Sequence, residues 1–153
     1  IREVRTLSYL LHPPMLDETG IEDAIRHYVD GFTKRSSIRV ALEVSPRFGR
    51  MTRNAELALF RVVQEGLTNI QRHSGSSNAR IRLDRTPEKV TLEVSDKGHG
   101  MPGLNQTGDG TLPPDAGVGI LSMVERVKQI GGLLVIESDD KGATLRVTLP
   151  AYA

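Results

Sequence analysis

Four groups of residues in this chain combine side-chain types and spacings that could bind a phosphate or a purine. The first is Glu65, Asn69, Arg72 and His73, whose offsets of four, seven and eight residues predict one shared helical face. A carboxylate, an amide and two potential cations on one face would suit a metal–phosphate group. Mg²⁺ keeps most of its waters, so one Asn carbonyl oxygen plus phosphate oxygens is a reasonable ligand set. The alternative interpretation is the solvated face of an amphipathic helix.

The second group is Asp96-Lys97-Gly98-His99-Gly100-Met101, in which an aspartate precedes closely spaced glycines. A carboxylate at the end of a predicted strand can accept a hydrogen bond from an exocyclic amine. The glycines beside it would let a flat ring approach the backbone, because they have no β-carbon. Asp and Gly are also the usual residues of a simple turn, so the pattern fits that interpretation as well.

The third group is Gly117-Val118-Gly119, directly before a predicted helix. A helix N-terminus offers free N–H groups and a positive dipole end, and it therefore holds phosphate well. A glycine hinge that starts a helix is the alternative. The fourth group contains Thr144, which could bond a base or a bridging water but could equally be an ordinary strand threonine.

The elements that would position these groups follow from the spacing of apolar residues. Alternating apolar residues predict five strands, and three- and four-residue spacing predicts a helical tail that ends at Pro13 and Pro14 and three further helices. The strands are expected at about 38–44, 79–84, 90–95, 133–138 and 143–149, and the three further helices after Thr19, over 52–74 and from Gly119 to about 130.

Short connections fix how the strands pair. About three residues separate the second and third strands, and 139–142 separate the last two, so both pairs must be antiparallel hairpins. The sequence therefore predicts an α+β fold of two layers, with a mostly antiparallel five-stranded sheet and three helices on its one apolar face. Residues 97–116 are expected to form a mobile, functional loop.

Composition narrows the class of protein. The 153 residues are 38% hydrophobic and 25% charged, which suits one globular domain. A net charge of +1 does not favour a nucleic-acid partner, and zero cysteines exclude disulfides and thiolate metal sites. No apolar run is long enough to cross a membrane. Because Ile1 lies inside a predicted helix, we interpret the chain as part of a longer cytoplasmic protein or of the cytoplasmic part of a membrane-anchored sensor.

The order of the four groups resembles one family over nearly the whole chain. It is similar to the ATPase superfamily shared by histidine kinases, gyrase, heat-shock chaperones and mismatch-repair proteins, the GHKL superfamily with the Bergerat fold. In this resemblance, residues 64–73 correspond to the N box, 96–101 to the first glycine box and 117–120 to the second.

The resemblance implies a role for each matching position. Asp96 would bind the adenine amino group with help from Thr144, and Asn69 would ligate Mg²⁺. Glu65 would be the general base of phosphoryl transfer, in which positioning and charge neutralisation supply most of the catalysis. The other implied ATP contacts are Gly98, Gly100 and Met101 around the base, Gly117, Val118 and Gly119 at the end of a flexible ATP lid, and Arg72 or His73 beside the phosphates.

The amino-terminal stretch indicates a branch of the superfamily. Residues 2–17 resemble the junction after the dimerisation helices of nitrate-sensor-like histidine kinases, as do residues 64–69 and 123–127. Residues 1–17 are thus expected to be the end of a dimerisation and phosphoacceptor helix with its linker, and 18–153 the ATP-binding catalytic domain. His12 precedes a proline at the helix end, so we interpret it as junction packing rather than as the phosphoacceptor.

Three functions stay open on these residues. The first is a histidine kinase domain that transfers the γ-phosphoryl group to a histidine on an absent dimerisation domain, for relay to the receiver domain of a response regulator. The second is an ATP-driven conformational machine of the chaperone or gyrase type. The third is a nucleotide-sensing module or a serine-directed anti-sigma kinase. The kinase would be a homodimer at full length, without contact of this fragment to nucleic acid or membrane.

Overall fold

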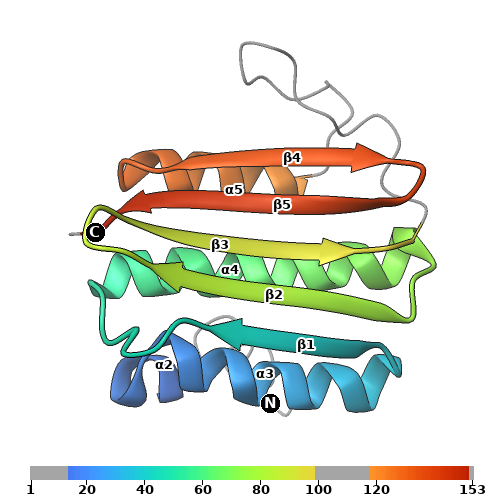
Figure 1. Ribbon diagram of the computed structural model, residues 1–153, viewed down its shortest axis with the longest axis horizontal. Coiled ribbons are helices and arrows are strands. Elements are labelled where there is room, and N and C mark those ends of the chain that lie inside the picture. Colours follow the sequence, from blue (N-terminus) through green and yellow to red (C-terminus); the bar gives the residue numbers. More distant parts are fainter. Residues whose placement is uncertain (1–13, 99–117, 152–153) are drawn as a thin grey trace.

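Five strands form a single sheet within residues 14–98 and 118–151, the parts of the chain that the computed structural model describes (Figure 1). Their order across the sheet is β1-β2-β3-β5-β4. Both predicted hairpins are present, since β2 pairs antiparallel with β3 and β4 with β5. The strands are β1 (Arg39–Val44), β2 (Asn78–Arg85), β3 (Lys89–Asp96), β4 (Leu133–Asp139) and β5 (Gly142–Pro150).

One pair of strands is parallel, so the sheet is mixed. β1 runs parallel to β2, whereas β3 and β5, which join the two hairpins, are antiparallel. A parallel pair needs a long crossover, and the helix between β1 and β2 supplies it. The prediction of a mostly antiparallel five-stranded sheet is confirmed. The parallel pairing of the edge strand β1 was not predicted, because the two short hairpin links do not determine it.

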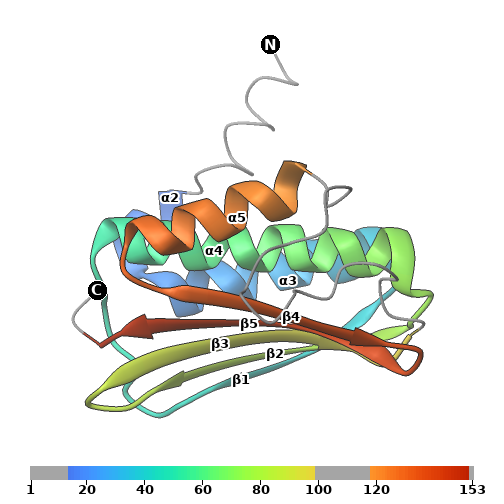
Figure 2. The same cartoon turned by 90° about the horizontal axis from the view of Figure 1, so that it is seen from above.

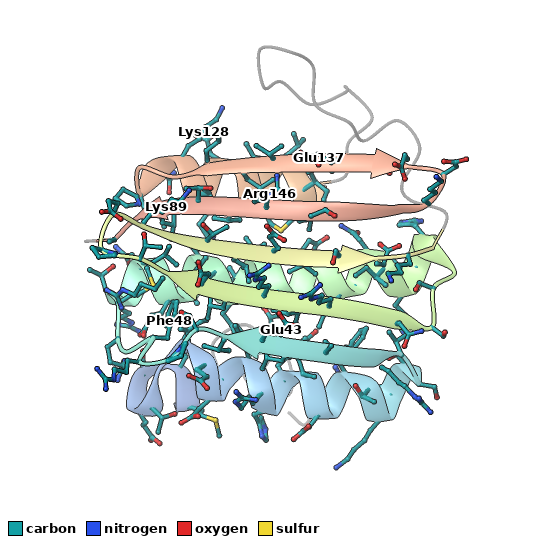
Figure 3. All side chains as sticks on the ribbon, viewed as in Figure 1. Glu43, Phe48, Lys89, Lys128, Glu137 and Arg146 are labelled. Carbon is teal, nitrogen blue, oxygen red and sulfur yellow. The ribbon has the colours of Figure 1, made fainter. Side chains whose placement is uncertain are left out.

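The two faces of the sheet differ because side chains alternate along each strand. Residues of one face are buried beneath the helices, as in β5, where alternate positions from Ala143 to Leu149 are buried. The opposite face carries no helix among the described residues and displays charged side chains, four of which are labelled in Figure 3. Arg146 there donates hydrogen bonds to Glu93 at 3.1 Å and Glu137 at 3.3 Å. This pattern gives a solvated face laced by cross-strand ion pairs.

Three long helices cover the apolar face, as predicted, with α4 between α3 and α5 (Figures 1 and 2). Thr52 caps the first turn of α4 by accepting a hydrogen bond from the Ala55 backbone N–H at 3.2 Å. Because α4 has neighbours on both sides as well as the sheet, it is buried around most of its circumference. The helices are α3 (Ile21–Ser36), α4 (Arg53–Asn69) and α5 (Val118–Gln129).

Two features of the helical layer were not predicted. A short helix, α2 (Pro14–Thr19), precedes α3, and Leu16 within it is buried in the main core, so the expected boundary at 17/18 divides this helix. Proline suits the first position of a helix, because that N–H has no partner anyway. The predicted 52–74 helix ends as a π-helical turn, η1 (Ile70–Ser74). The helical tail expected over 1–12 lies outside the described residues. Among the described residues, no helix is long and apolar enough to cross a membrane.

The described residues of the four groups singled out in the sequence lie at one end of the sandwich. α4 and β3 run in the same direction and end there, while α5 and β5 begin there (Figures 1 and 2). A candidate site built from a helix end, a strand end and two element starts is therefore assembled by the topology itself.

Candidate functional site

Asp96 supplies a buried hydrogen-bond acceptor at the end of the central strand β3. The residue is 9% exposed, and burial alternation turns its side chain toward the helical layer. One carboxylate oxygen, Oδ1, accepts a hydrogen bond from the Gly98 N–H at 2.7 Å. The other, Oδ2, is buried without a hydrogen-bond partner among the described residues. Such a group costs free energy until a donor reaches it, so Asp96 is the first candidate for a ligand contact.

Gly142 holds the β4–β5 hairpin tightly against the backbone of Asp96. Its φ of +148° is rare for residues with side chains. A β-carbon placed on Gly142 would overlap the Asp96 carbonyl and lie 3.1 Å from Cα of Lys97. Glycine at this position therefore lets β5 begin in contact with the turn that presents the Asp96 carboxylate.

Asn69 is brought to the same end by a close contact between α4 and the sheet. A β-carbon on Gly66 would lie 3.0 Å from side-chain atoms of both Val94 and Leu145, so glycine is what lets α4 approach this closely. Asn69 follows Gly66 by about 4.5 Å along the helix axis, and Asp96 follows Val94 by about 6.6 Å along the strand. Asn69 is 7% exposed, and its Nδ2 is buried without a partner in the described parts of the chain.

Glu65 lies where α4 meets the start of α5. A β-carbon on Gly119 would collide with the Glu65 carboxylate, so the two predicted groups are in direct contact. The carboxylate is half-buried beside the first turn of α5, whose N–H groups carry a partial positive charge. Gly119 thus makes room for an acidic side chain at the position where the sequence predicted a phosphate.

Arg72 and His73 lie beyond the end of α4 and differ from Asn69 in their exposure to solvent. Both lie in the π-helical turn η1 and are exposed, whereas Asn69 at the end of α4 is buried. A π-helix closes i→i+5 hydrogen bonds, so each residue advances by a smaller angle than in an α-helix. The angular positions of Arg72 and His73 relative to Glu65 therefore differ from those in an unbroken α-helix.

Thr144 lies on the opposite face of the sheet from Asp96. It pairs with Ser95 in the β3–β5 register, and both are partly exposed on the face away from the helices. Ala143, the preceding residue, is buried on the side that Asp96 faces. The prediction that Thr144 assists Asp96 is therefore corrected, because strand alternation directs the Thr144 side chain away from the candidate site.

A polar group on α3 supports α4 beside Glu65 and was not found from the sequence. Tyr28 packs edge-on against Phe60 with ring centroids 5.7 Å apart and hydrogen-bonds to Thr68. Thr68 in turn donates to the Gln64 carbonyl oxygen at 2.8 Å. Burial is the main cause that raises the pKa of Tyr28, with Arg35 acting in the opposite direction and the nearby Glu65 charge adding to the rise. Burial therefore keeps the Tyr28 hydroxyl in its neutral form beside Thr68.

Only some of the other predicted site residues belong to the described parts of the chain. Gly98 is described and binds Asp96 through its N–H, and Val118 begins α5. Gly100, Met101 and Gly117, together with most of the loop predicted over 97–116, lie outside the described parts of the chain. Of the residues that the structure does describe, Glu65, Asn69, Asp96, Gly98 and Gly119 converge at one end of the sandwich.

This convergence on the helix-covered face of a two-layer sandwich is the arrangement of a nucleotide-binding domain, and comparison with known proteins makes the class specific. A family model described as "Histidine kinase-, DNA gyrase B-, and HSP90-like ATPase" matches residues 54–153. The chain belongs to this family, which confirms the superfamily that the sequence motifs predicted.

Relatives align along the whole chain. It is 33% identical over 153 residues to the sensor histidine kinase MctS of Rhizobium johnstonii, covering 100% of this chain and 32% of MctS. It is 31% identical over 150 residues to the sensor histidine kinase NarS of Mycobacterium tuberculosis, covering 96% of this chain and 33% of NarS. The chain therefore spans about a third of the length of these relatives.

A solved structure agrees on the fold. The histidine kinase domain from the Erythrobacter litoralis EL346 blue-light activated histidine kinase superposes with a TM-score of 0.71 at 18% identity. The match covers 93% of this chain and 70% of that domain. At this identity the likeness establishes the two-layer fold alone.

The contact between Gly142 and Asp96 predicts a large cost for adding one methyl group. Gly142→Ala should lower the free energy of unfolding by about 3 kcal/mol, the sum of overpacking and a strained φ. Gly49→Ala is the matched control, because Gly49 has a φ of 73° but no neighbour closer than 3.8 Å to the position that the added methyl group would occupy. The control should lose only about 1 kcal/mol. Urea unfolding measures both, and equal losses would contradict the tight contact.

Proposed function

We propose that this domain binds ATP with Mg²⁺ and transfers the γ-phosphoryl group to a histidine on a dimerisation domain outside the chain. The phosphohistidine would then pass its phosphoryl group to the receiver domain of a response regulator. The family match and the alignment with sensor histidine kinases along the whole chain support this function. In the longer protein the domain would work as part of a cytoplasmic homodimer.

The single observation that carries the proposal is the Asp96 oxygen that has no hydrogen-bond partner within the described residues. A buried carboxylate with one oxygen fixed by the Gly98 N–H and the other without a described partner requires a donor. The exocyclic amine of adenine is such a donor, and guanine presents a carbonyl oxygen in its place. A carboxylate at this point therefore favours adenine over guanine, because two acceptors facing each other would leave both unpaired.

Asn69 fits the metal that the family implies. Its amide is buried where α4 ends, and no described residue hydrogen-bonds to its Nδ2, so the amide can turn its carbonyl oxygen toward a cation. Amide oxygens are hard ligands of the kind Mg²⁺ prefers, and one is enough when phosphates and water complete the shell. When bound, Mg²⁺ would neutralise charge on the phosphates; the chain contributes the position and orientation of Asn69.

Glu65 would act as the general base. The imidazole nitrogen of the acceptor histidine forms the new N–P bond, and the bond between the γ-phosphorus and the bridging oxygen breaks as ADP leaves. The proton lost by the imidazole passes to the Glu65 carboxylate. Contact with Gly119 on one side and the Tyr28–Thr68 support of α4 on the other restrict where this carboxylate can lie.

The Asp96 role predicts opposite effects on affinity and stability. Asp96→Asn should weaken ATP binding at least tenfold, about 1.4 kcal/mol, because an acceptor with a charge is lost. Without nucleotide the variant should be as stable as the parent or more so, since a buried unpaired charge is removed. Calorimetry and thermal unfolding measure the two quantities. Asp84→Asn on the solvated face is the control, and an unchanged affinity in Asp96→Asn would refute the adenine contact.

The Asn69 role predicts a change in metal dependence. The parent domain should bind ATP more tightly with Mg²⁺ than with a chelator, and Asn69→Ala should bind equally in both conditions. Asn78→Ala, an exposed asparagine just after η1, should keep the parent's difference. Titration with ATP in the two buffers tests this. A variant that retains the full Mg²⁺ effect would exclude Asn69 as the ligand.

The Glu65 role is tested by transfer in trans. Supplied with γ-labelled ATP and a separately made dimerisation–histidine domain, the parent should label the histidine. Glu65→Gln should keep the ATP affinity within twofold and slow labelling by about 10²–10⁴-fold. Glu125→Gln on the exposed surface of α5 is the control. Fast phosphate release without any acceptor would instead identify an ATP-driven conformational machine, and equal labelling rates would remove Glu65 as base.

A further inference from the structure

Glu56 is a second buried carboxylate that nucleotide binding does not use. Its residue is 1% exposed, and it lies in the first turn of α4, at the opposite end of that helix from Asn69. Thirteen residues of helix separate the two, about 20 Å. Burying a carboxylate this far from the site calls for a separate explanation.

Arg50 pairs with Glu56 in a two-pronged contact. Nε donates to Oε2 and Nη2 to Oε1, both at 3.1 Å, and the Met51 backbone N–H donates to Oε2 at 3.3 Å. Both carboxylate oxygens are therefore satisfied, and the planar guanidinium is held in one orientation.

The same guanidinium binds the end of α2. Nη2 donates to the carbonyl oxygens of Asp17 at 3.1 Å and Leu16 at 3.4 Å, and Nη1 lies 3.5 Å from that of Glu18. The last carbonyls of a helix have no partner within it and carry a partial negative charge, so a cation is well placed there. Arg50 thus connects the C-terminal end of α2 to the N-terminal end of α4.

The surroundings fit this connection closely. Gly20, between α2 and α3, has a φ of 99°, and a β-carbon on it would lie 2.8 Å from Cδ of Arg50. Behind Arg50, Arg85 donates to the backbone carbonyls of Phe48 at 2.7 Å and of Arg50 at 2.9 Å. Phe48, labelled in Figure 3, is buried in the core. The loop that carries Arg50 is therefore fixed on both sides.

We propose that Arg50 and Glu56 form a rigid joint that holds α2, through which the preceding segment enters the domain, to the start of α4. The joint makes α2 and α4 move as one unit, so the position of α2 is fixed relative to the nucleotide end of α4. Its part in transfer rests on the proposed function, in which that segment leads to the phosphoacceptor domain. Its mechanical part depends only on the contacts of Arg50.

Hydrogen exchange on the 153-residue chain tests the joint directly. In Arg50→Gln and in Gly20→Ala, the amides at the end of α2 and at Gly20 should exchange at least tenfold faster than in the parent. Amides of residues 66–69 and 92–95 should keep their rates, and the ATP affinity should stay within twofold. Arg80→Gln is the matched control, because Arg80 also binds a carboxylate through two bonds, to Glu43, but on the solvated face.

A hydrophobic replacement separates the joint from general stability. Arg50→Met combined with Glu56→Leu removes both charges while keeping apolar volume, so that no uncompensated carboxylate is left buried beside the half-exposed position 50. The double variant should unfold near the parent's midpoint and still expose α2 to exchange, which keeps the test valid if a single variant does not fold. Unchanged exchange at α2, or a uniform rise across the chain, would overturn the joint.

Transfer measurements distinguish the joint from the proposed function. In a chain that also carries the dimerisation domain, Arg50→Gln should slow transfer within that chain at least tenfold. Transfer in trans from the isolated domain should stay within twofold of the parent. Equal slowing in both arms would overturn the role of the joint in transfer. Failure of the parent to transfer in either arm would refute the proposed function, while the exchange experiment would still decide the mechanical joint.

Discussion

The close approach of α4 to the sheet at Gly66 is the constraint on which the site depends. Without a side chain there, the helix rests directly on Val94 and Leu145, neighbours on β3 and β5. Every position beyond this contact is then fixed by regular geometry, so Asn69 and Asp96 arrive at the same end of the sandwich. Gly142 repeats the device between β5 and the end of β3. Close contacts at Gly66 and Gly142 thus position the site, although neither glycine is assigned a contact with the nucleotide.

Much of this arrangement was predictable because local patterns determine it. Alternation fixed the five strands and which of their residues are buried, and short connections fixed the two hairpins, since a link of three or four residues permits nothing else. Asp96 stood out because a carboxylate at a strand end beside glycines combines two unusual features. Glu65 and Gly119 were each predicted as site residues, but their direct contact comes from the packing of α5 on α4 and was not predicted.

The features that were not predicted depend on three-dimensional packing, which the spacing of single residues does not describe. A π-helical turn has the same apolar spacing as the end of an α-helix over five residues, so spacing alone does not predict the change of helix type at Ile70 that alters the angular positions of Arg72 and His73. The prediction for Thr144 rests on its residue type alone. The face that its side chain occupies is set by the alternation along β5, in which the neighbouring Ala143 is buried. The parallel pairing of β1 with β2 depends on the crossover through α4. Tertiary packing, and no local sequence pattern, decides which strand β1 pairs with. Gly66 carried a usable signal, since glycine inside an apolar helix often marks close packing.

The two carboxylates buried in the described residues show how such groups divide into structural and functional ones. Glu56 has both oxygens bonded, to Arg50 and to the Met51 N–H, so its burial is compensated whether or not a ligand is present. Asp96 has one oxygen bonded and one without a described partner, so part of its burial cost persists until a donor arrives. A fold retains such a cost where binding recovers it, and compensates it elsewhere. The uneven satisfaction of two similar groups therefore separates the ligand end of α4 from the end that anchors α2.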